Sequence, residues 1–227
     1  MSLKGTACLA MWWDMAAEMR SEFEHWHTHE HFSERLAIAG FERATRWTDA
    51  KGGEGVFVMY ELADWETLAS PAYLAALNAP SPWSMRMMPH HRHMVRSQCR
   101  VLESRGAAVA RQALTVRLSP ADGLADALRA ALKARAAELV VQPGLAGMHL
   151  LRHQAPAIAE TTEQKIRGGA DQGADWVLVV CGYEAAELDA LAQTQFDDAS
   201  LQALGARPGA VRGRYALSLS AVTGDMQ

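Results

Sequence analysis

Four histidines at alternate positions are the part of this chain most suited to chemistry. The segment EHWHTHEHFSER, residues 24–35, contains His25, His27, His29 and His31. Imidazole titrates near neutral pH and binds divalent metal ions, so histidines can serve as acid–base groups or as metal ligands. Because residues four apart share one face of a helix, a helix here would separate the histidines into two pairs, 25 with 29 and 27 with 31.

The second pair lies beside an apolar face of the same helix. Phe23 and Trp26 fall on that face, so we expect it to be buried, with Glu30 at its rim. A carboxylate beside an imidazole can orient the ring and raise its basicity. We therefore predict that His31, His27 and Glu30 form a catalytic group, in which one of the histidines performs general acid–base chemistry.

Two other interpretations of the histidines stay open. They could form a solvated polar face of an amphipathic helix. They could also bind a metal ion, because two histidines four apart can chelate it and His90, His91 or His93 could add a third ligand. The segment lacks the HExxH motif, since HEHFSE has no second histidine at the required spacing. The predicted site therefore contains no metal and no other cofactor.

Aromatic residues are concentrated in the first half of the chain. Tryptophans occur there at positions 12, 13, 26, 47, 65 and 83, and later only at 176. Such a concentration favours an aromatic-lined pocket, although most of these side chains are typical of a core. The predicted substrate contacts are Trp26 and Phe23 on the histidine helix, and Trp83 and Arg86 in a loop that could cover the cavity mouth. Arg86 could hold a carboxylate or an enolate.

The elements that position these residues occur in the same order twice. Hydrophobic patterns and turn signals in the first half predict strands at 6–13, 40–47, 56–62 and 93–104, helices at 16–38 and 64–78, and a loop at 79–91. The second half predicts strands at 110–118, 147–154, 175–183 and 211–222, helices at 120–141 and 184–194, and a long polar insert, 155–174, as a loop. The order β-α-β-β-α-β is that of a ferredoxin-like unit.

Each unit would form a four-stranded antiparallel sheet with both helices on one face and an uncovered apolar face on the other. Two such faces can bury each other. We therefore predict an α+β fold in which tandem ferredoxin-like repeats form an intramolecular pseudo-dimer. Residues 1–105 are the first repeat and carry the site; residues 106–227 are a second, degenerate repeat. The helix predicted at 120–141 has no His, Trp or Phe, so we expect one pocket, with the second repeat as wall and scaffold.

The first repeat resembles the dimeric α/β-barrel superfamily. The likeness rests on Phe23, Trp26, Glu30, His31, Glu34 and Arg35, followed by AGF at 39–41, and it is strongest to the EthD-like group. That group usually has its histidine four residues after the tryptophan, whereas here the histidine follows five residues after it. The resemblance covers residues 5–104, and the second repeat fits by topology. It implies one of several activities, because the superfamily includes cofactor-free monooxygenases, cyclases, isomerases, dehydratases and haem-binding or haem-degrading proteins.

Composition narrows the class of protein. The 227 residues carry a formal net charge of -4 without a dense Lys/Arg stretch, which argues against a nucleic-acid partner. No segment predicts a secretory signal or a membrane span. Cys8, Cys99 and Cys181 are far apart and lie in apolar stretches, so we expect reduced, buried thiols. These features predict a cytoplasmic, bacterial protein without a membrane partner, and a homodimer of the pseudo-dimeric chain is compatible with them.

Together, these features predict a small-molecule enzyme or binding protein. It would act on a hydrophobic, aromatic-type ligand by cofactor-free acid–base chemistry of the monooxygenase, dehydratase or isomerase type. One alternative is a non-catalytic stress or interaction barrel, which a sealed interior filled by side chains would favour. The other alternative is a metal-binding or haem-binding protein.

Overall fold

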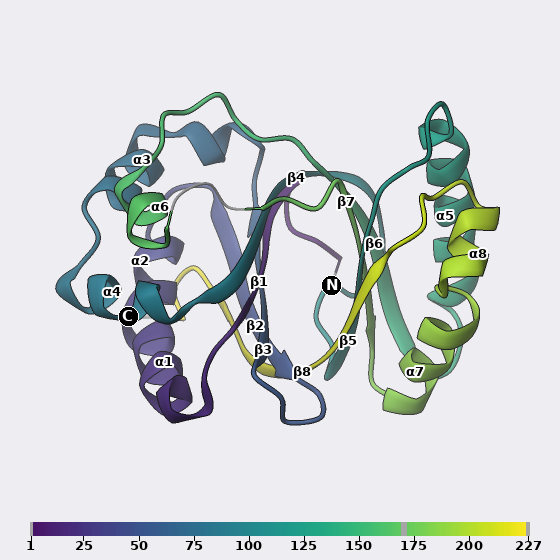
Figure 1. The fold of residues 1–227 in the computed structure, drawn as a ribbon, viewed down its shortest axis with the longest axis horizontal. Coiled ribbons are helices and arrows are strands. Elements are labelled where there is room, and N and C mark those ends of the chain that lie inside the picture. Colours follow the sequence, from purple (N-terminus) through teal and green to yellow (C-terminus); the bar gives the residue numbers. More distant parts are fainter. Residues whose placement is uncertain (1, 169–171, 226–227) are drawn as a thin grey trace.

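A computed structural model of the chain describes residues 2–168 and 172–225. In this part of the chain, eight antiparallel strands close into a barrel (Figure 1). The strands are β1 (Ala7–Asp14), β2 (Phe41–Asp49), β3 (Gly55–Leu62), β4 (Arg92–Gly106), β5 (Gln112–Leu118), β6 (Leu145–His153), β7 (Trp176–Gly182) and β8 (Val211–Val222). Their order around the barrel is β1-β3-β2-β8-β5-β7-β6-β4.

The barrel consists of two sheets with the same internal order. The first repeat contributes β4-β1-β3-β2 and the second β8-β5-β7-β6, so the fourth, first, third and second strands of each repeat follow one another. The sheets join at both edges, where β2 pairs with β8 and β4 pairs with β6. This arrangement confirms the predicted α+β pseudo-dimer of ferredoxin-like units.

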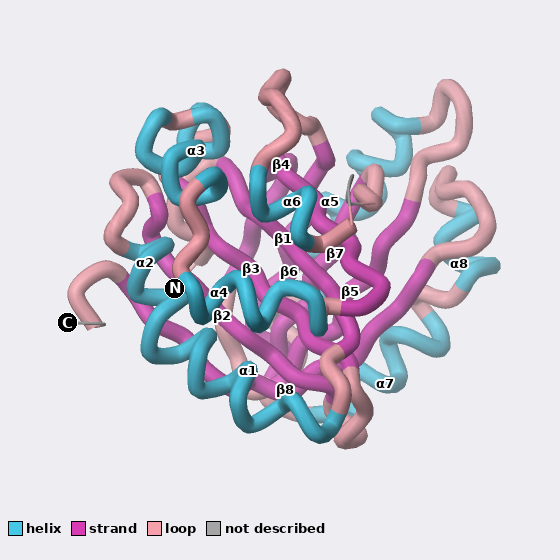
Figure 2. Tube along the Cα trace, turned by 60° about the vertical axis from the view of Figure 1, so that its left-hand side comes forward, coloured by secondary structure: helices cyan, strands magenta, loops and turns pink. Residues whose placement is uncertain are grey.

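Helices cover the outside of the barrel at two opposite ends (Figures 1 and 2). In the first repeat, one continuous helical segment comprises η1 (Ala17–Met19), α1 (Arg20–Trp26), the π-helical turn η2 (His27–His31) and α2 (Phe32–Leu36). The same layer contains η3 (Glu66–Ala69), α3 (Pro71–Asn78), α4 (Pro82–Met87) and η4 (Met88–His90). The second repeat contributes α5 (Ala125–Leu139), α6 (Thr162–Ile166), α7 (Ala185–Thr194) and α8 (Asp198–Ala203). No helix in the described ranges is long and apolar enough to cross a membrane.

Side chains fill the interior of the barrel. Trp12 and Trp47 both stack on Phe57, with ring centroids 5.0 and 5.1 Å apart. Because successive side chains of a strand point to opposite faces, Trp13 lies on the outer face, among the residues that pack against the helices. The three cysteines belong to the interior cluster, where they are buried and free, which agrees with the predicted buried thiols.

Two segments that were predicted as loops contain short helices, so these predictions were wrong. In 79–91, Ser81 accepts a hydrogen bond from the backbone N–H of Ser84, and Pro82 occupies the first turn, which together start α4. In the insert 155–174, Thr161 and Gln164 form a reciprocal capping box that starts α6. Both signals are local and short, and the many Pro, Ser and polar residues around them favoured a loop.

Candidate functional site

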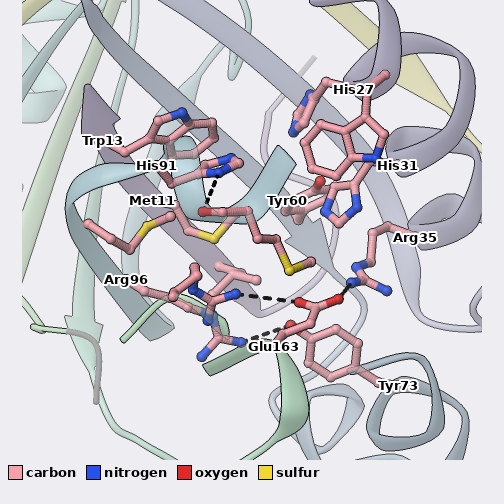
Figure 3. Close-up of a pocket in the computed structure, with 15 residues that line it drawn as sticks. Met11, Trp13, His27, His31, Arg35, Tyr60, Tyr73, His91, Arg96 and Glu163 are labelled. Carbon is pink, nitrogen blue, oxygen red and sulfur yellow. Dashed lines mark hydrogen bonds and ion pairs between the residues drawn. The ribbon is translucent and has the colours of Figure 1, made fainter. Parts of the chain in front are cut away.

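A small cavity lies between the outer face of the first sheet and the helices that cover it (Figure 3). Its volume is about 40 Å³. The strands and the histidine helix contribute Leu9, Met11, Trp13, Tyr60, Met94, Arg96, Trp26, His27, His31 and Arg35; the remaining lining residues are Tyr73, Met88, His91, Glu163 and Arg167. Since a water molecule needs about 10–15 Å³ of such space, the cavity has room for a few waters.

The π-helical turn determines how the histidine helix faces this cavity. The backbone N–H of Phe32 donates to the carbonyl of His27, five residues earlier, whereas an α-helix bonds residues four apart. The wider turn accommodates one extra residue and brings the ring of His31 to 4.6 Å from the ring of Trp26. His31 therefore lies against Trp26 although it follows five residues later.

His27 and His31 are neutral bases in this position. They are 1% and 8% exposed, and their ring centroids are 5.3 Å apart. Burial, followed by the neighbouring ring of His31 and the charge of Arg46, lowers the pKa of His27 well below its usual value. Burial and the charge of Arg35 do the same to the pKa of His31. A neutral imidazole can accept a proton, so both rings can act as bases at pH 7.

Polar atoms without partners gather around the same cavity. Within the described residues, the Nδ1 atoms of His27 and His31, the Tyr60 hydroxyl and the Trp13 Nε1 are buried without a hydrogen-bond partner. Each such atom costs about 1–3 kcal/mol relative to a satisfied one. Buried polar groups in proteins are normally satisfied by protein atoms or ordered water, so this cluster is typical of a place where a polar ligand or water binds.

A third imidazole, His91, borders the cavity from the end of the α4 region. Its ring centroid lies 4.9 Å from that of Trp13, and its Nδ1 is 3.1 Å from the backbone carbonyl of Met87. Burial of the ring and the charge of Arg167 lower the pKa of His91 to about 4. The cavity thus contains three neutral imidazoles at pH 7.

Charged side chains surround the other side of the cavity. Arg35 forms an ion pair with Glu163, and Arg167 lies 3.5 Å from the same carboxylate. Arg96 donates a hydrogen bond of 2.8 Å to the hydroxyl of Tyr73. Three guanidinium groups with one carboxylate give this side a positive charge, which favours an anionic ligand or an anionic intermediate.

Glu163 and Arg167 belong to the insert of the second repeat. In Figure 1 this segment crosses from the strands of the second repeat, and it places α6 beside α3 and η4. The second repeat was expected to act as wall and scaffold. The structure shows that this wall includes charged side chains, Glu163 and Arg167, that line the pocket.

Two predicted residues lie beside the cavity without lining it. Glu30 accepts hydrogen bonds from Trp26 Nε1 at 3.1 Å and from the hydroxyl of Ser81 at 2.5 Å, so it ties the histidine helix to α4. Phe23 is fully buried, and its ring lies 5.1 Å from that of His27. Glu30 and Phe23 therefore hold Trp26 and His27 in place rather than face the cavity.

Trp83 and Arg86, the other predicted substrate contacts, lie away from the cavity lining. Trp83 Nε1 donates to the Glu22 carboxylate at 2.8 Å. Arg86 is exposed and its guanidinium lies 3.4 Å from the carbonyl of Pro82. Both residues belong to α4, whose buried face carries Ser84 and Met87. Trp83 is half-buried against the core of the first repeat, and Arg86 points to solvent.

Several lining residues were not predicted as site residues. Arg35 belongs to the pattern that carries the family likeness, and this was the signal that could have assigned it. Tyr60 alternates with Val56 and Val58 on the outer face of β3, so a tyrosine at this position signals a polar group beneath the helices. Glu163 had no local signal, because its partner Arg35 is 128 residues away.

The other histidines lie outside the cavity. His25 and His29 are exposed, with ring centroids 5.0 Å apart, as the helix prediction implied. His90 and His93 are exposed as well. Within residues 2–168 and 172–225, no three His, Cys, Asp or Glu side chains gather closely enough to hold a metal ion.

A larger and more open cavity of about 490 Å³ lies where the two repeats meet. Two of its charged lining residues are solvated: His93 is 81% exposed and pairs with Asp14, and Arg207 is 54% exposed and pairs with Asp122. A third, Arg117, is half-buried over the ring of Trp12. The smaller cavity is therefore the better candidate for chemistry, because its imidazoles and guanidinium groups are shielded from water.

Comparison with known proteins identifies the fold. No protein-family profile matches the chain, and no curated protein matches it in sequence. Among solved structures, an anthrone oxidase-like protein aligns with a TM-score of 0.66 at 11% identity, covering 100% of this chain and 98% of that one. A protein from Fusobacterium nucleatum assigned as a monooxygenase aligns with a TM-score of 0.62 at 9% identity over 97% and 96% of the two chains.

A protein from Lactobacillus acidophilus, also assigned as a monooxygenase, aligns with a TM-score of 0.60 at 11% identity over 97% and 98% of the chains. The fold is therefore of the dimeric α/β-barrel type. All of these alignments span both repeats, so the whole chain corresponds to one fused dimeric α/β barrel. At such low identities the likeness establishes the fold alone, and EthD-like membership stays a prediction.

Proposed function

We propose that this dimeric α/β barrel is a small-molecule enzyme that acts on a hydrophobic, aromatic ligand without a cofactor. His31 is the general base, with His27 beside it, and Trp26 packs against the ligand. The observation that carries the proposal is a pair of buried, neutral imidazoles at one cavity whose Nδ1 atoms have no hydrogen-bond partner within the described residues; the Glu34 carboxylate lies 3.9 Å from the Nδ1 of His31. A base of this kind can remove a proton from a weakly acidic C–H or O–H group of a bound molecule.

The surroundings of the histidines support this chemistry. When a neutral base removes a proton from a neutral ligand, the ligand becomes an anion. The guanidinium groups of Arg35 and Arg96 border the same cavity and can stabilise that charge. Reaction of the resulting carbanion with O₂ would give a monooxygenase-type product, while return of the proton elsewhere or loss of water would give an isomerase or a dehydratase.

Anthrone is a suitable probe, since it is an aromatic carbon acid and one structural neighbour is named anthrone oxidase-like. Proton removal is followed under nitrogen as deuterium uptake from D₂O into the anthrone methylene, and oxidation is followed under air as oxygen consumption. We expect the wild-type protein to accelerate deuterium uptake over buffer. His31→Ala should abolish this acceleration and leave the fold nearly intact.

His29→Ala is the matched control, because His29 is an exposed histidine on the same helix. It should retain the wild-type rate. Deuterium uptake at the buffer rate with wild-type protein, or at the wild-type rate with His31→Ala, would contradict the proposal. Oxygen consumption by the wild-type protein would then assign the monooxygenase outcome, whereas deuterium uptake without oxygen consumption would favour the isomerase or dehydratase type.

A non-catalytic barrel is the second candidate, favoured by the barrel interior that aromatic and aliphatic side chains fill. The candidate cavity lies on the other face of the sheet, however, so a filled interior does not remove the enzyme proposal. EthD-like membership, a cytoplasmic location and a homodimer of the pseudo-dimeric chain are further proposals. Sedimentation of the purified protein would test the homodimer.

A further inference from the structure

The insert of the second repeat is attached to the first repeat mainly through polar contacts. The backbone N–H of Thr162 donates to Asn78 Oδ1 at 3.1 Å, and the side chain of Glu163 reaches Arg35. In the described part of the insert, the buried residues are Pro156, Thr161 and Glu163. With little apolar surface buried, α6 can separate from the first repeat at a lower cost than a core helix can.

Glu163 is the acidic residue among the described residues that line the cavity. Its carboxylate and the guanidinium of Arg35 are both buried, with side chains 6% and 4% exposed. Leaving one partner of a buried ion pair alone is strongly destabilising. Arg35 therefore requires an anion at this position, whether the anion comes from Glu163 or from a ligand.

Arg167 lowers the free-energy cost of replacing Glu163 by a ligand anion on Arg35. It follows Glu163 by four residues in the same segment and lies 3.5 Å from its carboxylate. If α6 moves aside, Glu163 keeps this partner. Arg35 and Arg96 then face the cavity with the neutral histidines and the Tyr60 hydroxyl, so the vacated position is positively charged and lined by aromatic rings (Figure 3).

The size of the cavity points to the same movement. Its volume of about 40 Å³ is too small for an aromatic ring, because a cavity that binds benzene measures about 150 Å³. Displacement of Glu163 opens space beside Arg35 in the same cavity, and the flexible side chains of Met11, Met88 and Met94 can adjust around a ring.

We propose that the pocket binds an aromatic anion whose oxygens replace the Glu163 carboxylate on Arg35, while α6 moves aside. This inference rests on the proposed function, because it names the ligand class of the same pocket. Glu163 is thus an internal substitute for the ligand's charged group. The ring of the ligand lies against Trp26 and His31, and its charge lies on Arg35.

Benzoate and benzamide test the inference, since they share a ring and differ in charge. Calorimetric titration at pH 7.5 compares wild-type protein with Glu163→Gln and with Glu160→Gln, an exposed carboxylate of the same insert. Charge-assisted hydrogen bonds are worth about 1.5–3 kcal/mol, so Glu163→Gln should bind benzoate about 10- to 100-fold more tightly than wild type. Its affinity for benzamide, and both affinities of Glu160→Gln, should match wild type.

A second measurement uses the wild-type protein, in case Glu163→Gln does not fold. Benzoate should accelerate amide hydrogen exchange at residues 162–166, and benzamide should not. Three results would each overturn the inference. Glu163→Gln could raise the affinities for benzoate and benzamide equally, or it could leave the affinity for benzoate unchanged. Benzoate could also leave amide hydrogen exchange at residues 162–166 of the wild-type protein unchanged. Anthrone deuterium uptake tests the proposed function separately. If deuterium uptake depends on His31 but Glu163→Gln and the wild-type protein bind benzoate equally well, this inference alone fails.

Discussion

The two repeats have the same topology but use the space beneath their first helices differently. In the first repeat, the helix from α1 to α2 buries Trp26, His27, His31 and Arg35 against the sheet. In the second repeat, α5 buries Leu128, Leu132, Ala136 and Leu139 at the corresponding place. One layer is aromatic and polar around a cavity, and the other is an aliphatic core.

This difference indicates that the second repeat mainly stabilises the fold, whereas the first repeat carries the site. Burial of apolar surface stabilises the aliphatic layer of the second repeat. The first repeat keeps buried polar atoms without partners, which lowers stability and is typical of functional sites. The second repeat also supplies Glu163, so a segment of the stable repeat completes the site of the other one.

The largest expected difference between the repeats is in the response to core substitutions. Leu132→Ala in α5 leaves a cavity in a packed layer and should lower the free energy of unfolding by about 2–5 kcal/mol. His31→Leu replaces a buried polar ring by an apolar side chain of similar size and should change it by less than about 1.5 kcal/mol. Guanidinium unfolding at pH 7 measures both. Equal decreases in the free energy of unfolding for Leu132→Ala and His31→Leu would contradict this difference between the repeats.

The pH dependence of stability should be specific to the buried histidines. Burial holds the pKa of His27 and His31 below the unfolded value of about 6.5, so below that pH the unfolded state binds more protons than the folded state. Stability should therefore fall as the pH decreases below 6.5, by up to about 1.4 kcal/mol per pH unit for each such histidine.

His31→Gln should reduce this slope, and the exposed control His25→Gln should not. Urea unfolding between pH 7 and pH 5 gives the two slopes. An unchanged slope in His31→Gln would show that this ring takes up protons in the folded protein as it does in the unfolded one. The second repeat offers an internal comparison in His149, whose burial lowers its pKa to about 4.

Tyr60→Phe should produce the smallest change in stability. The hydroxyl of Tyr60 is buried without a partner within the described residues, so its removal should leave stability unchanged or raise it by up to about 1 kcal/mol. If the hydroxyl binds the ligand, benzoate affinity should fall by about tenfold at the same time, which corresponds to one hydrogen bond. A stability loss above 1 kcal/mol together with unchanged affinity would assign Tyr60 a structural role.

The fold was predictable because its signals are local and occur twice. Alternating strands such as 56–62 and the long periodic helix at 16–38 each specify one element, and their order specifies the ferredoxin-like unit. The burial of Trp26, and the position of His27 and His31 beside the buried face, followed from the same periodicity. The π-helical turn did not, because a helical wheel assumes a constant rotation per residue and the turn changes it at 27–31.

The charged half of the site was not predictable from local patterns. Glu163 meets Arg35 only because the insert crosses from one repeat to the other, and a single sequence carries no signal for that path. The length and polarity of 155–174 did indicate function, since long inserts in compact domains are usually functional or disordered. Trp83 and Arg86 were assigned to the site on the assumption that α4 was a loop.

The central claim is that His27 and His31 are neutral bases in a ligand-binding cavity. Nuclear magnetic resonance of protein labelled with ¹⁵N-histidine tests it most directly, with signals assigned through His27→Gln and His31→Gln. We predict that both rings titrate well below 6.5 and that both signals shift when benzoate is added. Titration of both rings near 6.5, the value of a solvated imidazole, together with signals that do not respond to benzoate, would contradict the account.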